Sequence, residues 1–417
     1  MSLTQAFFLF IIAYPGVMAT VWMSGGLYYF FHWERKQQRQ TDCATNPNAP
    51  RVTVLVPCHN EGQNIKETIG HLSRQHYLNL EIIAINDGSR DNTGALLDEM
   101  MKQYSNLKVL HQENQGKASA MNHGLAEATG DIIVGIDGDS VLDYEAVSWM
   151  VEHFLIGPRV GGVTGNPRVR TRSTAVGKIQ TGEFSSIIGL IKRAQRVYGM
   201  VFTVSGVICA FRKQALLQVG GWSTDMITED IDVSWKLQLS GWQIRYEPHA
   251  LCWVLMPETL RGLFKQRLRW AQGGAEAFLR YFPLAIRWRN RRFWLLLLEY
   301  ILSSFWCYSL CVLAIFGVIQ WALNDIALHS VTTIILWSSS WLIPICLLQF
   351  AVSFFLDKRY DQDMGKHFFW SIWYPFFYWM LNLLTTVIAI PKAVTRRRGQ
   401  LAIWHSPDRG ETFRGHS

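Results

Sequence analysis

The sequence predicts an α/β domain inserted between membrane-spanning helices. Apolar stretches long enough to cross a bilayer lie near both ends of the 417 residues, since about 20 helical residues span its roughly 30 Å hydrocarbon core. Between them, short apolar runs alternate with stretches of helical spacing, which implies a sheet covered by helices on both faces. The expected parts are an N-terminal helix and linker at 1–47, the soluble domain at 48–257, basic interfacial helices at 258–292, membrane segments at 293–394 and a basic tail at 395–417.

The first apolar segment runs from Phe7 to Trp33, and no Lys or Arg precedes Arg35. A cleaved secretory signal would begin with basic residues, so we expect a single retained spanning helix here. The later apolar stretches are each too long for ordinary core helices, and they predict a multi-pass protein: Phe293 to Leu323, Val331 to Leu356 and Phe368 to Ile390.

Basic residues flank the soluble domain on both sides. Arg35, Lys36 and Arg39 follow the first span, and nine Lys or Arg stand against Glu276 alone in residues 261–292. Positive charge favours the cytoplasmic side, so we expect a cytoplasmic domain with free thiols. Because the net charge of +8 crowds the membrane flanks, it favours lipid headgroups over nucleic acid as a partner.

The C-terminal "TRRRGQ", Thr395 to Gln400, conflicts with three spans that start from the cytoplasm, because it would then lie on the outer side. Either the last segment, interrupted at Pro375, is re-entrant, or the charge bias is overruled.

Polar loops follow the expected strands of the soluble domain. They read "PCHNEG", "NDGSRDNT", "NQGKAS" and "DGDS", and they are rich in carboxylates, amides and Gly. In open α/β sheets, ligands bind beyond the carboxyl ends of the strands. The loops therefore predict a polar, phosphate-bearing ligand.

Asp137 and Asp139 flank Gly138 after the fourth apolar run. Residues i and i+2 of an extended backbone project from one face, and two carboxylates there suit a divalent cation that keeps water and phosphate ligands. A solvated acidic turn is the alternative.

Three further polar positions each have a structural alternative. Asp87 follows its strand directly, where an Asx-turn is common. Lys117 lies in "GKAS", which is not a Walker loop because His111 and Ala118 stand where Gly and Ser or Thr are required, so Lys117 contacts a phosphate or is a surface lysine. Glu229 begins an amphipathic helix, where acids also favour the macrodipole.

In this order, "VPCHNEG", "NDGS", "IDGDS", "TED" and "QRLRW" resemble the motifs of the processive family-2 inverting glycosyltransferases that make cellulose, hyaluronan and chitin. Two longer stretches, from Thr164 to Lys213 and from Met226 to Glu276, are similar more narrowly to the bacterial poly-β-1,6-N-acetylglucosamine synthases. The similarity runs from about Arg51 to the end of the chain. Asn86 departs from the acid usual before Asp87.

The resemblance implies a GT-A-like nucleotide-sugar-binding domain. It would transfer N-acetylglucosamine from UDP-N-acetylglucosamine to a growing polysaccharide with inversion, using Mg²⁺ or Mn²⁺, and export the product across the bacterial inner membrane for a biofilm. The residues carried over are Asp230 as the catalytic base with Glu229, the donor-binding Asp87, Glu61, Lys117, Asp137 and Arg269, the acceptor-binding Trp270 and Gln266, and the metal ligands Asp137 and Asp139.

The side chains of the motif "QRLRW" suit the two parts of such a substrate. The planar fork of Arg269 suits a diphosphate, and the flat face of Trp270 suits a sugar. An interfacial amphipathic helix is the structural alternative, and we expect both to hold.

The resemblance also implies a small membrane accessory subunit and control by cyclic di-GMP, although the sequence contains no separate effector domain. Two other functions stay open: a synthase of chitin, hyaluronan or cellulose type, and a sugar transporter whose domain senses nucleotide.

Overall fold

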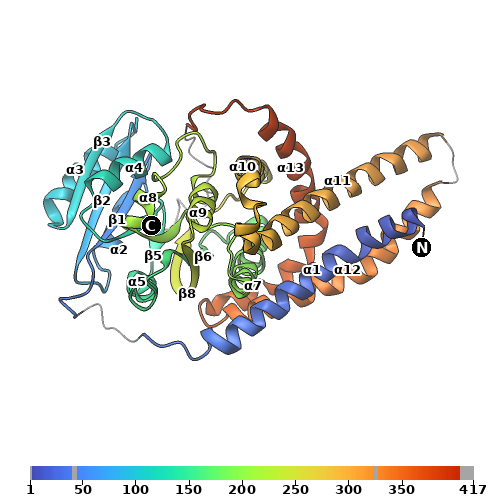
Figure 1. Cartoon of the computed structure of the whole chain (residues 1–417), viewed down its shortest axis with the longest axis horizontal. Coiled ribbons are helices and arrows are strands. Elements are labelled where there is room, and N and C mark those ends of the chain that lie inside the picture. The colour runs from blue at the N-terminus through green and yellow to red at the C-terminus, as the bar shows by residue number, and fades with distance from the viewer. Residues whose placement is uncertain (1, 40–44, 324–326, 404–417) are drawn as a thin grey trace.

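The computed structural model describes residues 2–39, 45–323 and 327–403, so the end of the expected tail, from 404 on, lies outside it. Figure 1 shows an α/β domain at one end of the molecule and a group of long helices at the other. Among these described residues, four helices are long and apolar enough to cross a membrane: Gln5–Glu34, Trp288–Ile319, Ser340–Asp357 and Phe377–Thr395.

One eight-stranded sheet forms the centre of the domain, in the order β3-β2-β1-β4-β7-β6-β8-β5. Its strands are β1 (Val52–Cys58), β2 (Leu80–Asp87), β3 (Leu107–Gln112), β4 (Ile132–Ile136), β5 (Val141–Leu142), β6 (Val160–Val169), β7 (Ile208–Arg212) and β8 (Gln243–Val254). The first four strands are parallel, as the apolar runs predict. Strand β7 is antiparallel to both β4 and β6, so the other half of the sheet is mixed.

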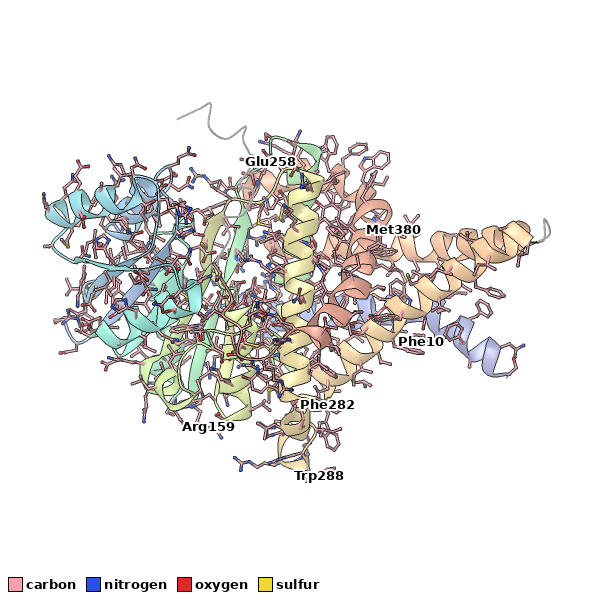
Figure 2. The ribbon with its side chains drawn as sticks, turned by 90° about the horizontal axis from the view of Figure 1, so that it is seen from above. Phe10, Arg159, Glu258, Phe282, Trp288 and Met380 are labelled. Carbon is pink, nitrogen blue, oxygen red and sulfur yellow. The ribbon has the colours of Figure 1, made fainter. Side chains whose placement is uncertain are left out.

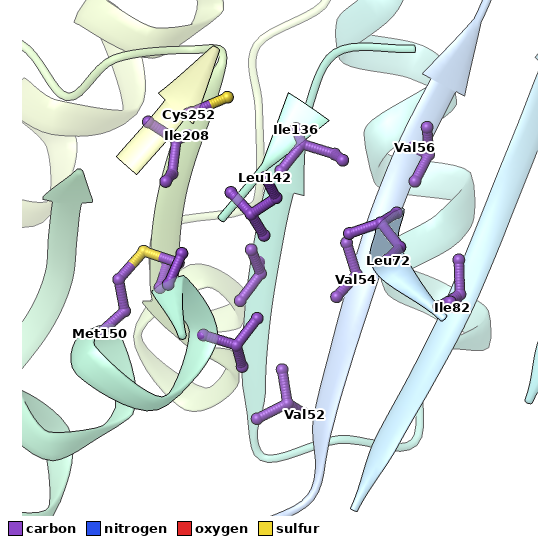
Figure 3. Packing of buried hydrophobic residues seen from close by; sticks show 14 of the residues in the cluster. Val52, Val54, Val56, Leu72, Ile82, Ile136, Leu142, Met150, Ile208 and Cys252 are labelled. Carbon is purple, nitrogen blue, oxygen red and sulfur yellow. The ribbon is translucent and has the colours of Figure 1, made fainter. Parts of the chain in front are cut away.

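Helices cover both faces of the sheet, which confirms the predicted α/β class. Val52, Val54 and Val56 of β1 face one core, together with α2 (Ile65–Leu72), α3 (Thr93–Gln103) and α5 (Ala146–Ile156) (Figure 3). Leu55 of the same strand faces the opposite core, formed with α4 (Lys117–Glu127), α8 (Lys213–Gln218) and α9 (Glu229–Leu239). Alternate residues of a strand point to opposite faces, so a strand buried on both sides is apolar throughout.

The remaining helices are the long apolar helices and the elements that connect them to the domain. They are α1 (Leu3–Tyr29), η1 (Phe30–Glu34), α6 (Ala175–Glu183), η2 (Phe184–Leu190), α7 (Ile191–Tyr198), α10 (Leu260–Ala285), η3 (Trp288–Phe293), α11 (Trp294–Leu323), α12 (Ala327–Asp357), η4 (Gln362–Trp373) and α13 (Tyr374–Thr395). In Figure 2, α10 lies between the sheet and the long helices, with Glu258 near one end and Phe282 near the other.

A buried ion network fastens two of the long helices to the domain. The Arg193 guanidinium donates to both carboxylate oxygens of Glu34, at 2.6 and 2.9 Å, and lies 2.8 Å from Asp357 Oδ1. Arg168 of β6 lies 2.9 Å from Asp357 Oδ2. All four side chains are at most 2% exposed, so each charge depends on its partners.

The last predicted segment differs in detail from the expectation. Residues 368–373 belong to the 3₁₀ helix η4, and Pro375 lies in the first turn of α13, where a missing N–H costs nothing, so it does not interrupt the helix. Towards its two ends α13 contacts α6 and α10: Tyr378 Oη donates to Val176 O at 3.2 Å, and Arg396 lies 2.8 Å from Glu276. Arg396 also donates to Asp225 O at 2.8 Å, so the residue that follows α13 contacts the α/β domain.

Candidate active site

The turn after β4 carries Asp137 and Asp139, and both side chains are partly exposed. Helix α2 holds this turn in place, because Thr68 Oγ1 donates to Gly138 O at 3.0 Å. Glu61 is 1% exposed, and a Cβ on Gly138 would lie 3.0 Å from its Cγ. Glu61 therefore packs beneath the turn, and the two aspartates are the carboxylates that face outward.

Lys117 connects this turn to a second acidic pair. Its Nζ lies 2.6 Å from Asp137 Oδ1 and 3.0 Å from Glu229 Oε1, and it donates to Gly206 O at 3.3 Å. Burial opposes the charge on Lys117, but Asp137 and Glu229 hold its pKa above the usual range. The surface-lysine alternative is thus wrong, because the Lys117 side chain points into the site.

Glu229 and Asp230 begin α9 side by side, and their environments differ. Burial raises the pKa of Glu229, but Lys117 outweighs this effect and leaves it below the usual value. Burial and the neighbouring Glu229 raise the pKa of Asp230 to about 6, although Lys117 and Arg269 oppose the rise. Two adjacent carboxylates of different proton affinity are typical of acid–base sites.

The helix α10 approaches this pair closely. A Cβ on Gly273 would lie 2.0 Å from Thr228 Oγ1, so only glycine lets α10 pack against the start of α9. Arg269 is exposed and lowers the pKa of both Glu229 and Asp230, which places its charge near theirs. Trp270 is partly buried, and Gln266 accepts from Arg267 Nη1 at 3.0 Å. Of the expected group, Arg269 is therefore near the acidic pair, while Trp270 packs against one core of the sheet.

Asp87 is fully buried, and its carboxylate holds the loop after β3. Oδ1 accepts from Gln112 Nε2 at 2.8 Å and from the amide of Gln115 at 2.9 Å, while Oδ2 accepts from the amide of Gly116 at 2.9 Å. Gly116 has φ +89° and precedes Lys117 at the start of α4. In this structure Asp87 shapes the loop that presents Lys117.

The sequence does not predict some residues that lie at the site. Gly206 lines a narrow pocket with Lys117, Glu229 and Asp230, and its Cα hydrogens face Asp230. Behind it, buried Lys192 donates to Thr164 Oγ1 at 3.0 Å and to Ser205 Oγ at 2.6 Å, and burial lowers its pKa to about 7. These residues are distant in the sequence, and "VSG" carries no distinctive spacing.

The chain beyond α13 also lies at the site. Arg396 Nη1 donates to Asp225 O at 2.8 Å, and the Ala402 amide donates to Thr224 O at 3.0 Å. A Cβ on Gly116 would lie 2.3 Å from Ala402 O. Residues 396–403 therefore cross the rim formed by the loop after β3, a position that the charge pattern alone did not indicate.

The donor chemistry of the acidic turn fits a divalent cation. Asp137 and Asp139 offer hard oxygen ligands. Of the two oxygens of the Asp137 carboxylate, the ion pair with Lys117 involves Oδ1. Within the described residues, no group of three or more His, Cys, Asp or Glu is arranged to hold a metal ion. Two carboxylates with substrate and water as further ligands is the way that Mg²⁺ is usually bound.

An α/β sheet with polar, acidic turns at the carboxyl ends of its strands suits a ligand bound at that edge, and residues 50–273 match the model of the glycosyltransferase-like family 2. The chain belongs to this family and is a glycosyltransferase.

The most informative relatives match it along almost its whole length. A poly-β-1,6-N-acetyl-D-glucosamine synthase of Staphylococcus epidermidis is 41% identical over 409 residues, which cover 98% of this chain and 99% of the relative. The synthase of the same name from Staphylococcus aureus is 42% identical over 410 residues, covering 98% and 100%. Among solved structures, a mannosyltransferase of Pyrobaculum calidifontis in complex with GDP-Man and Mn²⁺ shares the fold, with a TM-score of 0.58 at 19% identity over 92% of this chain and 99% of its own.

Proposed function

We propose that the protein transfers N-acetylglucosamine from UDP-N-acetylglucosamine to a growing β-1,6-linked poly-N-acetylglucosamine chain, with inversion at the anomeric carbon. The observation that supports this proposal best is the convergence of Asp137, Lys117, Glu229 and Asp230 on one site beside the Arg269 and Trp270 helix. The names of the relatives, at 41% and 42% identity, supply the sugar and the linkage.

Asp230 serves as the base in this reaction. An alcohol holds its proton far more tightly than a carboxyl whose pKa is about 6, so Asp230 cannot ionise the acceptor hydroxyl beforehand. The oxygen–carbon bond forms while the proton moves to Asp230, the bond from the anomeric carbon to the diphosphate breaks, and UDP leaves. The raised pKa of Asp230 makes this transfer easier than it would be to an ordinary aspartate.

Positive charge must stabilise the leaving diphosphate. Lys117 and Arg269 are the protein groups for this role, and the Arg269 fork can bind two phosphate oxygens at once. Asp137 and Asp139 would hold Mg²⁺, or Mn²⁺, and the bound ion supplies further charge stabilisation to the departing phosphates. Asp87 and Glu61 contribute to the donor site from beneath, through the loop before α4 and the turn after β4.

Trp270 provides the acceptor platform, with Gln266 nearby on the same helix. The candidate membrane helices among the described residues support a site next to the membrane, so the polymer would be exported as it grows, across the bacterial inner membrane and into a biofilm matrix. We place the α/β domain in the cytoplasm of a multi-pass protein. A small membrane accessory subunit and cyclic di-GMP belong to the same proposal as its regulators.

The test is UDP release by membrane vesicles that contain the protein, given UDP-N-acetylglucosamine and Mg²⁺. Asp139→Ala should abolish release, whereas Asp98→Ala, which removes an exposed carboxylate from α3, should leave it intact. Linkage analysis of the radiolabelled product should give β-1,6 bonds. A β-1,4 product would assign the chain to another polymer, and sugar flux without UDP release would make it a transporter.

A further inference from the structure

A second arginine lies inside the "QRLRW" stretch, at a position to which the motif gives no role. Arg267 is 5% exposed, and its Nη2 donates to Glu183 Oε2 at 2.5 Å. Its guanidinium carbon lies 4.3 Å from the centroid of the Trp270 ring. This distance is well inside the 6 Å within which a cation is attracted to an aromatic face. Arg267 therefore links a buried carboxylate to the indole of the motif.

Glu183 is buried, and Arg267 is the basic group that pairs with its carboxylate. It is the last residue of α6, and 4% of its surface is exposed. Burial raises the pKa of Glu183, and Arg267 is the group that opposes the rise. A buried ion pair adds little net stability, because desolvation costs about as much as the attraction returns. Its more useful effect is to fix the geometry of the groups that it joins.

We propose that Arg267, held by Glu183, is a positioning residue that fixes the Trp270 indole in the orientation that receives the acceptor sugar. The role rests on the proposed function of Trp270 as the acceptor platform. Residues three apart on a helix lie on the same face, so Arg267 reaches Trp270 within α10 while Glu183 anchors it from α6. Gln266, which accepts from Arg267 Nη1, is held by the same guanidinium.

The expected effect follows from the cost of ordering a side chain. Without the guanidinium against it, the indole adopts several orientations, and acceptor binding must select one of them. Immobilising one such side chain at binding corresponds to about a three- to tenfold loss of affinity. The loss falls on the acceptor, because Arg267 contacts neither the acidic turn nor Lys117 among the interactions that the described residues show.

The experiment compares full-length variants in vesicles, with UDP release measured against the concentration of β-1,6-linked N-acetylglucosamine oligomers and, separately, of donor. Glu183→Gln with Arg267→Met removes both charges together, so no buried charge is left unpaired and the fold is retained. Arg267→Lys keeps the ion pair but loses the planar stack. Arg261→Lys makes the same change at an exposed position of α10 and is the matched control.

We expect the acceptor KM to rise about three- to tenfold in the double variant and by a smaller factor in Arg267→Lys, with the donor KM and the unfolding temperature unchanged. An acceptor KM within twofold of the parent in the double variant overturns the role, as does an equal rise in both KM values. A parent protein that released no UDP would overturn the proposed function as well, whereas an active parent with unaffected variants overturns the role of Arg267 alone.

Discussion

Replacing Asp230 by asparagine should stop sugar transfer and stabilise the fold. The folded protein raises the pKa of this carboxyl from 3.8 to about 6, first through burial and then through the charge of Glu229. That difference corresponds to about 3 kcal/mol, which is what the ionised side chain costs the folded state at neutral pH. Because the side chain keeps some contact with solvent, we expect a gain of about 1–3 kcal/mol on neutralisation.

The sign depends on pH. The folded state binds the proton of Asp230 more tightly than the unfolded state does, so the cost appears as pH rises from about 4 and is complete above about 6. The gain of Asp230→Asn should therefore be full at pH 8 and absent at pH 4. Asparagine keeps an oxygen that can accept from the Ile231 amide, which now lies 2.9 Å from Asp230 Oδ1.

The assay is thermal unfolding of the purified protein in detergent at pH 8 and at pH 4, together with UDP release at pH 8. Asp232→Asn is the matched control on the same helix. Asp232 is fully buried, lies 3.3 Å from Lys236 and accepts from Tyr281, so its neutralisation should lower the unfolding temperature. An Asp230→Asn protein that unfolds at or below the parent temperature at pH 8, or that still releases UDP, would refute the reasoning.

Three other substitutions have definite expected outcomes. Glu229→Gln removes a charge that raises the pKa of Asp230, so the acid limb of the pH profile of UDP release should move downward, by up to about one pH unit; an upward movement contradicts this. Asp139→Asn should raise the Mg²⁺ concentration for half-maximal activity about 10- to 100-fold, measured by metal titration, and an unchanged requirement argues against a ligand role. Arg193→Met leaves the buried Glu34 without its arginine and removes one of the two arginines that pair with Asp357, so it should cost about 3–5 kcal/mol in denaturant unfolding, whereas the exposed Arg261→Met should cost almost nothing.

The first half of the fold could be predicted because its strands are buried on both faces. The continuous apolar composition of β1, β2 and β4 predicts these strands. Because the strands are parallel, the loops that follow them lie at one edge of the sheet. Strand β6 gives no such signal. It reads "VGGVTGNPRV" and is buried at every position, yet it carries Gly, Pro and a buried Arg168 that pairs with Asp357 nearly 200 residues later. Packing partners supplied by distant segments leave no local periodicity.

The same limit applies to the site. Asp137, Asp139 and Lys117 could be predicted because each directly follows a strand or begins a helix, where topology fixes its direction. The sequence predicts that Asp87 lies at the donor edge of the sheet. It does not predict the hydrogen bonds that the buried Asp87 accepts from the loop after β3. Gly206 contributes its backbone and its small size, which a sequence does not distinguish from any other glycine.

The acidic side chains of the site outnumber its basic side chains. The site contains four carboxylates and two basic groups, so its protein groups alone leave an excess of negative charge. The carboxylates are those of Asp137, Asp139, Glu229 and Asp230, and the basic groups are those of Lys117 and Arg269. Together with burial, which is the larger cause, the nearby charge of Glu229 raises the pKa of Asp230. A divalent cation at the acidic turn would cancel the excess of negative charge, and Lys117, which engages both Asp137 and Glu229, could then turn toward a phosphate. The same excess of negative charge that costs the folded state stability would favour the binding of a metal-bound diphosphate, which is why stability and transfer should change in opposite directions on neutralising Asp230.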